Sequence, residues 1–269
     1  MSNYNLTGLY IYPVKSLGGI SLQSAVVTKH GFKYDRRWLL VDEEKRFITQ
    51  RTHPQMSLIG VDIKGTAMEF YHKLSGSNFT LDIECRSKCI VDVIIWEDNI
   101  EAEYVSSAAD EWFSDMLKTK CRLVYMPEDT VRSVDKKYAL NNEIVSFADG
   151  FPFLLIGQAS LDDLNSRLQL KLPMNRFRPN IVFTGGNPFD EDMIKSFSAG
   201  GITFYPVKPC ARCVITTIDQ MNGSKNEEPL KTLSTYRKVN NRILFGYNLL
   251  HSGTGTISAG DELKIIEWK

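Results

Sequence analysis

Two cysteines three residues apart, Cys210 and Cys213, have the clearest capacity for chemistry in this sequence. A pair at this spacing can bind zinc, exchange a disulfide or offer one thiolate to a ligand. Structural zinc needs four ligands, usually a second cysteine pair or a histidine pair. The other candidate ligands are isolated along the chain: Cys85, Cys89, Cys121, His30, His53, His72 and His251. The sequence therefore argues against structural zinc.

The neighbours of the pair separate the remaining alternatives. A thioredoxin-like redox pair opens a helix, whereas the run 214–218 after Cys213 is β-branched and typical of a strand. Lys208 and Arg212 would lower the pKa of a nearby thiol and favour the thiolate. A single soft thiolate suits a metal that another molecule already chelates. Two cysteines buried in a barrel wall remain the alternative without chemistry.

Short basic stretches beside expected strands could hold such a cofactor. They contain Lys15 and Ser16, Arg36 and Arg37, and Arg176, Arg178 and Asn180. An arginine beside a strand is most often a solvated edge residue, so each stretch alone is a weak signal. Together they offer the forked and single donors that phosphate and pterin edges require.

The chain as a whole carries no net charge, with 32 Lys and Arg against 32 Asp and Glu. We therefore expect no nucleic-acid partner, and any anion site must be local. The apolar runs are far shorter than the ~20 residues of a membrane helix, and no secretory signal opens the chain, so we expect no membrane partner. The five scattered cysteines predict a reducing compartment, and hence a cytoplasmic protein.

Strand signals dominate the pattern. Short apolar runs bounded by turn residues predict strands at 9–12, 38–41, 46–50, 181–184 and 202–205, and two more in the tail around Gly260. We expect Pro206 to end the strand at 202–205. Helices are predicted at 106–118, capped by Ser106 or Ser107, and at 160–168, capped by Ser160. The fold class is mainly β with α (α+β), a barrel or sandwich with helices packed outside.

Several of these stretches resemble, in the same order, the motifs of the MOSC domain proteins, named for the molybdenum cofactor sulfurase C-terminal domain. They are YPVKS (12–16), YDRRW (34–38), ASLDDLNSRL (159–168), NRFRPNIVFTGG (175–186), PCARCVITTID (209–219), EPLKTLSTYR (228–237), FGYN (245–248) and GTISAGDEL (255–263). The chain is most similar to the branch that includes the mitochondrial amidoxime-reducing component and its bacterial relatives.

The resemblance implies a small β-rich N-terminal domain, residues 1–120, packed on a MOSC β-barrel domain, residues 121–269. A molybdenum–molybdopterin cofactor would lie in the cleft between them. Cys213 would be the metal ligand and the catalytic residue, with Cys210 a neighbour that is not a ligand. Arg212 beside Cys213 would keep its thiol deprotonated until the metal arrives.

The cofactor-binding residues that the resemblance implies come from both domains. They are Lys15, Ser16 and Arg36 on the N-terminal side, and Arg178, Asn180, Ala211, Arg212, Cys213 and Asn248 on the barrel side. A further loop, matched loosely, adds Asp149, Gly150 and Phe151.

The implied activity is that of a molybdenum-dependent oxidoreductase that removes the N–O oxygen from small N-hydroxylated compounds. The chain has no C-x4-C-x2-C run for an iron–sulfur cluster, so an external electron-transfer protein or reductase should supply the electrons. The anchor of the mitochondrial relatives is not recognised either. Two alternatives stay open: a sulfur carrier that uses a persulfide on Cys213, and a cofactor-binding module without turnover.

Overall fold

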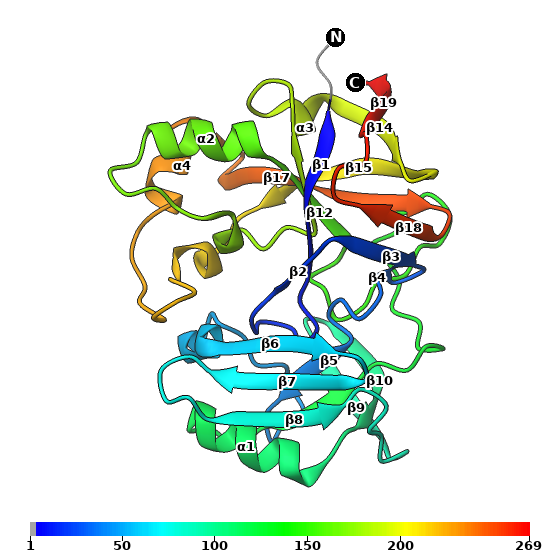
Figure 1. Cartoon of the computed structure of the whole chain (residues 1–269), viewed down its shortest axis with the longest axis vertical. Coiled ribbons are helices and arrows are strands. Elements are labelled where there is room, and N and C mark those ends of the chain that lie inside the picture. Colours follow the sequence, from blue (N-terminus) through cyan, green and yellow to red (C-terminus); the bar gives the residue numbers. More distant parts are fainter. Residues whose placement is uncertain (1–3) are drawn as a thin grey trace.

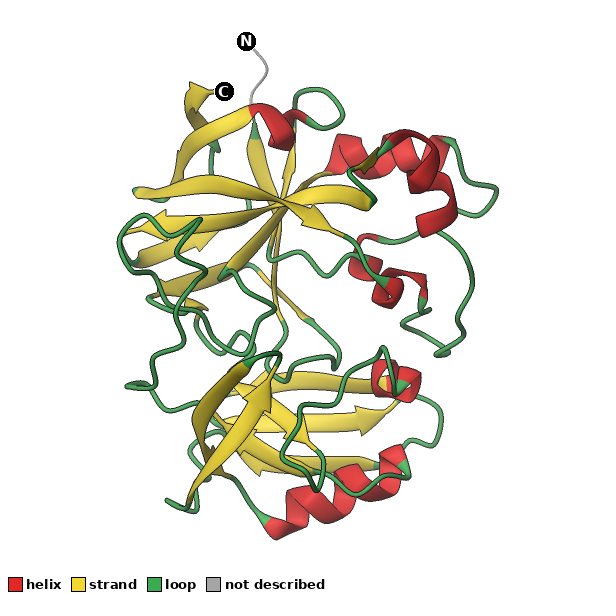
Figure 2. Ribbon diagram, turned by 180° about the vertical axis from the view of Figure 1, so that it is seen from behind, coloured by secondary structure: helices red, strands yellow, loops and turns green. Residues whose placement is uncertain are grey.

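The computed structural model describes residues 4–269, so residues 1–3 of the expected N-terminal domain lie outside the described residues. The chain forms two lobes, an upper one that contains the C-terminus and a lower one built around β6 to β10 (Figure 1). Seen from behind, the strands fill both lobes and the helices lie at their margins (Figure 2). The predicted fold class, mainly β with helices outside, is confirmed. None of the helices in residues 4–269 is long and apolar enough to cross a bilayer.

A large sheet forms the upper lobe. Its strands follow the order β19 (Lys264–Trp268), β14 (Ile194–Ala199), β15 (Ile202–Ala211), β17 (Arg242–Ser252), β12 (Phe153–Gly157), β13 (Ile181–Thr184), β1 (Asn5–Ile11) and β2 (Ile20–Leu22), and β16 (Lys238–Val239) pairs with β17. Neighbouring strands are antiparallel except β12 and β13, which run parallel.

A smaller sheet covers one side of this lobe. It consists of β18 (Gly255–Ser258), β3 (Ser24–Thr28) and β4 (Gly31–Phe32). Both sheets contribute to one buried cluster that includes Leu9, Phe32, Phe153, Phe204 and Ile257. Helices and turns complete the lobe: α2 (Gln158–Ser166), α3 (Asp190–Met193), α4 (Leu230–Tyr236), η2 (Met174–Arg176) and η3 (Val214–Thr217).

Two further sheets and a helix form the lower lobe. One sheet is β5 (Trp38–Val41), β11 (Arg122–Tyr125), β10 (Asp98–Tyr104) and β9 (Ile90–Ile95), and the other is β6 (Ile59–Lys64), β7 (Ala67–His72) and β8 (Asn78–Asp82). The turn η1 (Pro54–Leu58) precedes β6. Helix α1 (Ser107–Leu117) buries Phe113 against Phe70 of β7, with ring centroids 4.9 Å apart. Ser106 Oγ accepts a hydrogen bond from the Ala109 amide, which confirms one of the two predicted N-caps.

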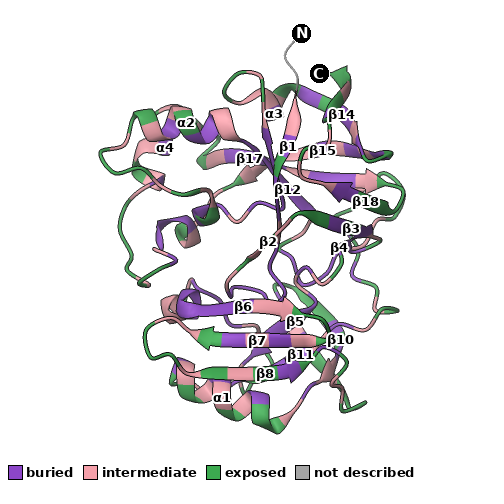
Figure 3. Ribbon diagram, viewed as in Figure 1, coloured by how far each residue is buried: buried purple, intermediate pink, exposed green. Residues whose placement is uncertain are grey.

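The chain passes between the lobes more than once. β1 lies in the upper sheet, where Leu9 pairs with Ile181 of β13. The loop after it packs Val14 and Leu17 into the lower core before β2 returns to the upper sheet. Residues 11–17, which make this crossing, are buried without a break (Figure 3). β11 pairs with β5 and β10 in the lower lobe. The boundary predicted between residues 120 and 121 stays a prediction.

Several predicted elements differ from the structure. The run 46–50 makes only isolated bridges, because Asp42 Oδ1 accepts from the amides of Glu44 and Arg46 and holds a turn there. The second helix begins at Gln158, so Ser160 lies inside it. The β-branched run after Cys213 is the 3₁₀ turn η3, in which the Cys213 carbonyl accepts from the amide and the hydroxyl of Thr216.

The strand expected to stop at Pro206 instead continues to Ala211 as β15. Its register with β17 shifts between Pro206 and Lys208, and again between Pro209 and Ala211. Irregular pairing of this kind accommodates proline, which cannot donate to a ladder. The longer strand contains Cys210, and Cys213 follows two residues after its end, so both cysteines line the cleft where the lobes meet.

Candidate functional site

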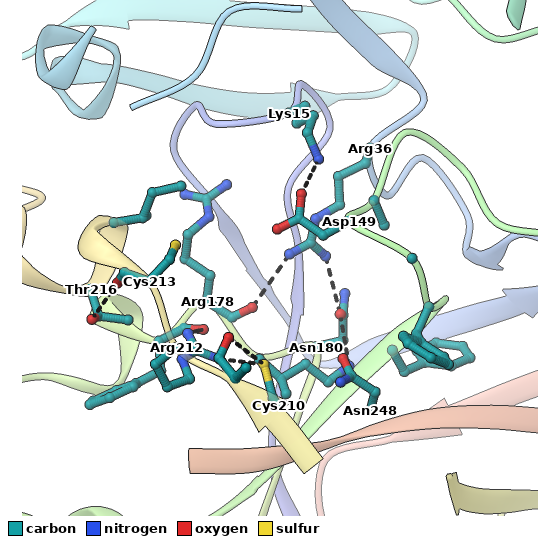
Figure 4. A pocket seen from close by; sticks show the side chains of 18 of the residues that line it. Lys15, Arg36, Asp149, Arg178, Asn180, Cys210, Arg212, Cys213, Thr216 and Asn248 are labelled. Carbon is teal, nitrogen blue, oxygen red and sulfur yellow. Dashed lines mark hydrogen bonds and ion pairs between the residues drawn. The ribbon is translucent and has the colours of Figure 1, made fainter. Parts of the chain in front are cut away.

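A cleft between the lobes collects the residues predicted for the site (Figure 4). Its void is about 800 Å³, counting the part that opens to solvent. All twelve residues line it: Lys15, Ser16, Arg36, Asp149, Gly150, Phe151, Arg178, Asn180, Ala211, Arg212, Cys213 and Asn248. The structure thus brings side chains from dispersed stretches to one place, while their roles there stay predictions.

Lys15 enters the cleft from the buried crossing segment. Its Nζ donates to the Phe147 carbonyl at 2.8 Å and to Asp149 Oδ1 at 2.5 Å. Burial lowers the pKa of Lys15 to about 8, even though the Asp149 carboxylate acts to raise it. Desolvation would raise the pKa of Asp149, yet its ion pairs with Lys15 and Arg51 hold that pKa below the ordinary value. These charges meet at the mouth of the cleft.

The lowered pKa of Lys15 predicts a pH dependence for anion binding. The ammonium form, which attracts an anion, dominates below about pH 8 and is lost as the pH rises through that value. We expect the affinity for inorganic phosphate, measured by titration calorimetry, to fall between pH 7 and pH 9.5, by up to ~10-fold per pH unit above 8. The Lys15→Met variant should bind phosphate more weakly, and its affinity should lose the part of the pH dependence that comes from Lys15. An unchanged slope in Lys15→Met would exclude Lys15 as its source.

Arg36 lies on the same side and is fixed by several acceptors. Its Nη1 donates to Asp35 Oδ2 at 2.6 Å and to Asn180 Oδ1 at 3.1 Å. Its Nη2 lies 3.4 Å from the Arg178 carbonyl oxygen. Asn180 also accepts from the Leu154 amide, so this amide side chain links the upper sheet to Arg36. The arginine is therefore held in place by the upper lobe as well as by its own turn.

Arg178 comes from the loop before β13. Its Nη1 donates to the Leu17 carbonyl at 2.7 Å, which joins the two lobes. Burial lowers its pKa to about 10, and the charge of Arg36 acts in the same direction. Both arginines and Ser16 have left-handed backbones, with φ of 55° at Arg178, 48° at Arg36 and 69° at Ser16. Such conformations cost free energy in residues other than glycine and cluster at ligand-binding sites.

The cysteine segment closes the cleft from the end of β15. Arg212 Nη1 donates to Cys210 Sγ at 3.0 Å, and Nη2 donates to the Phe177 carbonyl at 2.6 Å. The expectation that this guanidinium serves the Cys213 thiol is therefore not matched by its hydrogen bonds. Lys208, also expected beside the pair, instead lies over the rings of Tyr138 and Phe151.

Cys213 is a free, half-buried thiol at the start of η3. Figure 4 shows its sulfur apart from that of Cys210, so the two thiols face different parts of the cleft. Asn248, on β17, lines the cleft and donates from Nδ2 to the Lys208 carbonyl at 3.2 Å. Among the described residues, no three His, Cys, Asp or Glu side chains gather into a metal-binding group.

The structure also separates residues that the sequence could not distinguish. Arg176 is buried among the Thr216 and Thr217 carbonyls and pairs with Asp219 at 3.1 Å. Arg37 pairs with Glu128 at 2.8 Å. Both arginines therefore support the fold and do not line the cleft.

Arg51 is a cleft residue that sequence reasoning missed. It pairs with Asp149 at 3.5 Å and its guanidinium lies 4.6 Å from the Trp96 ring centroid. Only its charge could have suggested it, since it stands alone in a turn with no second basic residue beside it.

The side chains present suit an anionic cofactor that carries its own metal. The cleft offers two free thiols, two carboxamides and five basic groups, with Asp149 as the acid on its wall. The Nε of Arg212 is buried and has no hydrogen-bond partner among the described residues. A buried orphan donor at a cleft wall costs free energy unless a ligand supplies an acceptor. The donor set therefore fits a phosphate-bearing, polar ring system.

Comparison with protein families gives the relationship of the chain. Residues 3–120 match the MOSC N-terminal beta barrel domain, and residues 142–264 match the MOSC domain. The chain belongs to the MOSC family. Membership of this family suggests that the chain has a role related to the molybdenum cofactor and that it is a molybdenum-dependent enzyme.

MOSC proteins of several organisms are similar over most of the chain. Mitochondrial amidoxime-reducing component 1 of Mus musculus is 30% identical over 275 residues, covering 96% of this chain and 81% of that protein. The Homo sapiens protein of the same name is 31% identical over 280 residues, covering 96% and 82%. Molybdenum cofactor sulfurase of Oryza sativa subsp. japonica is 30% identical over 290 residues, which are 98% of this chain and 35% of that protein.

One solved structure has a weaker similarity. A solution structure from Bordetella bronchiseptica aligns with a TM-score of 0.31 and 13% identity, over 38% of this chain and 86% of that chain. This similarity is too low to support an argument.

Proposed function

We propose that this protein binds molybdenum–molybdopterin in the cleft and reduces small N-hydroxylated compounds, with electrons from an external protein or reductase. The observation that carries the proposal is the convergence of all twelve predicted residues, a free thiol and basic groups among them, on one cleft. The similarity to amidoxime-reducing components over nearly the whole chain supports the same activity.

In this proposal, each group has a role that its chemistry suits. The Cys213 thiolate is the one soft ligand from the chain for a metal that the pterin already chelates. Lys15, Arg36 and Arg178 supply positive charge for the phosphate, and their fixed hydrogen bonds limit the entropy lost on binding. The orphan Nε of Arg212 donates to a polar edge of the cofactor.

The reaction is a two-electron, two-proton reduction. The N–O bond breaks, the oxygen leaves as water, and an amidoxime becomes an amidine. When bound, the cofactor would supply the two-electron exchange for this step. The protein orients both molecules, and the unbroken burial of residues 11–17 keeps water away from one side of the cleft.

The test is turnover by protein purified from a host that makes the cofactor. With reduced methyl viologen as donor, an aryl amidoxime should yield the amidine, measured by chromatography, in proportion to bound molybdenum. The same chain from a cofactor-deficient strain should give none. Full molybdenum occupancy without turnover, with this donor and with a flavin donor, would favour a cofactor-binding module over an enzyme.

Sulfur transfer is the second candidate. It is favoured by the similarity to molybdenum cofactor sulfurase and by the two thiols that line one cleft. A persulfide on Cys213 would appear as one added sulfur atom in the mass of metal-free protein. Its presence, together with the absence of stably bound molybdenum, would support the carrier over the reductase.

A further inference from the structure

Tyr12 lies directly behind the cleft without lining it. It follows β1, is 3% exposed, and does not belong to the cleft wall. Its hydroxyl donates to the Pro179 carbonyl at 3.0 Å and its amide donates to Asp35 Oδ1 at 2.7 Å. A β-carbon on Gly19 would approach its ring to 2.4 Å, so the glycine leaves room for the ring. The ring is therefore fixed from several directions.

The aromatic ring of Tyr12 attracts the guanidinium groups of two cleft residues. The guanidinium carbon of Arg36 lies 4.3 Å from the ring centroid, and that of Arg178 lies 4.2 Å from the same centroid. These distances are within the range of cation–π attraction, which strengthens when the groups are desolvated. The two arginines come from residues 142 positions apart in the chain, yet they share one aromatic partner.

The arrangement addresses an electrostatic problem. The guanidinium carbons are at most about 8.5 Å apart, since each lies close to one centroid, and like charges at that distance repel in a protein interior. Asp35 neutralises Arg36, whereas the guanidinium of Arg178 donates its described hydrogen bond to the uncharged Leu17 carbonyl. Carboxylates beside both arginines would compete with an anionic ligand. The face of an aromatic ring holds the two arginines together and adds no negative charge.

We propose that Tyr12 is a positioning residue, whose ring face holds Arg36 and Arg178 together as one anion-binding pair. This inference rests on the proposed function, because the anion is the phosphate of the cofactor. The quadrupole of the ring attracts both guanidiniums, and the hydroxyl only anchors the ring to Pro179.

The test compares rings of the same shape and opposite face charge. Phenylalanine and pentafluorophenylalanine, each introduced at position 12, keep the packing, but fluorination reverses the charge of the ring face. Pterin released by cofactor-replete protein during dialysis is measured by fluorescence. We expect Tyr12→Phe to retain pterin like the wild type, and the pentafluoro variant to release it about tenfold faster. Tyr10→Leu, a nearby tyrosine outside the cleft wall, is the matched control and should retain pterin.

The outcomes separate this inference from the proposed function. If wild-type protein from a competent host holds no pterin, the proposed function fails. If the wild type and the pentafluoro variant release pterin at equal rates, Tyr12 has a packing role and the inference is overturned while the proposed function stands. The Nε–Hε NMR signals of Arg36 and Arg178 give a readout that needs no cofactor. They should show ring-current shifts in Tyr12→Phe and altered shifts in the pentafluoro variant; equal shifts in the two variants would also overturn the inference.

Discussion

Cys213→Ser should purify with little molybdenum from a host in which the wild type carries about one atom per chain. A serine hydroxyl is a hard, weakly acidic ligand and cannot replace a soft thiolate on this metal. Metal analysis by mass spectrometry, normalised to pterin fluorescence in the same sample, separates loss of the metal from loss of the whole cofactor. The fold should persist, because the thiol is half-buried and the backbone carbonyl of residue 213 still accepts the hydrogen bond of Thr216 at the start of η3.

Cys210→Ser is the matched control for this experiment. Cys210 lines the same cleft and receives a hydrogen bond from Arg212, which a serine oxygen can also accept. We expect it to keep most of its molybdenum. Equal metal contents in the two variants and the wild type would remove Cys213 as the ligand, and loss in both would assign a role to the pair.

Arg178→Ala should release pterin at least about tenfold faster than the wild type during gel filtration. The substitution removes a positive charge at the cleft wall and the hydrogen bond to Leu17 that spans the lobes. Arg167→Ala makes the same change of charge at the exposed C-terminal end of α2 and should retain pterin. Equal retention in both variants would exclude Arg178 from cofactor binding.

Arg36→Ala is a poorer probe of binding than the sequence indicated. Asp35 is buried and its side chain is 1% exposed, so removal of Arg36 leaves a carboxylate without its charged partner. Breaking a buried ion pair in this way typically costs ~3–5 kcal/mol. Loss of pterin from this variant would therefore mix unfolding with lost contact, and thermal unfolding must be measured beside it.

Several of these residues line one cleft, while their roles there stay predictions. Cys213, Arg36 and Arg178 were identified because ordered motifs fix residue types that the cleft then brings together. Local patterns predicted β5, β13 and α1 well, since β5 and β13 are continuous buried apolar runs and α1 buries one apolar face. The hydrogen-bond partners of the site residues were not predictable in this way. Arg212 donates to Cys210, and Arg51 reaches the cleft from a turn that carries no motif.

The two remaining errors have different physical causes. The run after Cys213 has the composition of a strand, yet its local hydrogen bonds to the Cys213 carbonyl favour a 3₁₀ turn. Pro206 ends strands in most settings, but the paired strand β17 accepts a shift of register there. The second outcome depends on the partner strand β17 and is not encoded in the neighbouring residues alone.

The place of β1 in the upper sheet constrains how the protein is made. Its partner β13 is synthesised some 170 residues later, so β1 can pair early only with β2, and its other edge must wait for most of the polypeptide. The lower lobe has all its strands between positions 38 and 125 and can fold earlier. Lys15 and its neighbours follow β1 directly in the chain, so their final position depends on the pairing of β1 with β13. Loading of the cofactor should therefore be a post-translational event, and a nascent chain stalled before residue 181 should be unable to accept it.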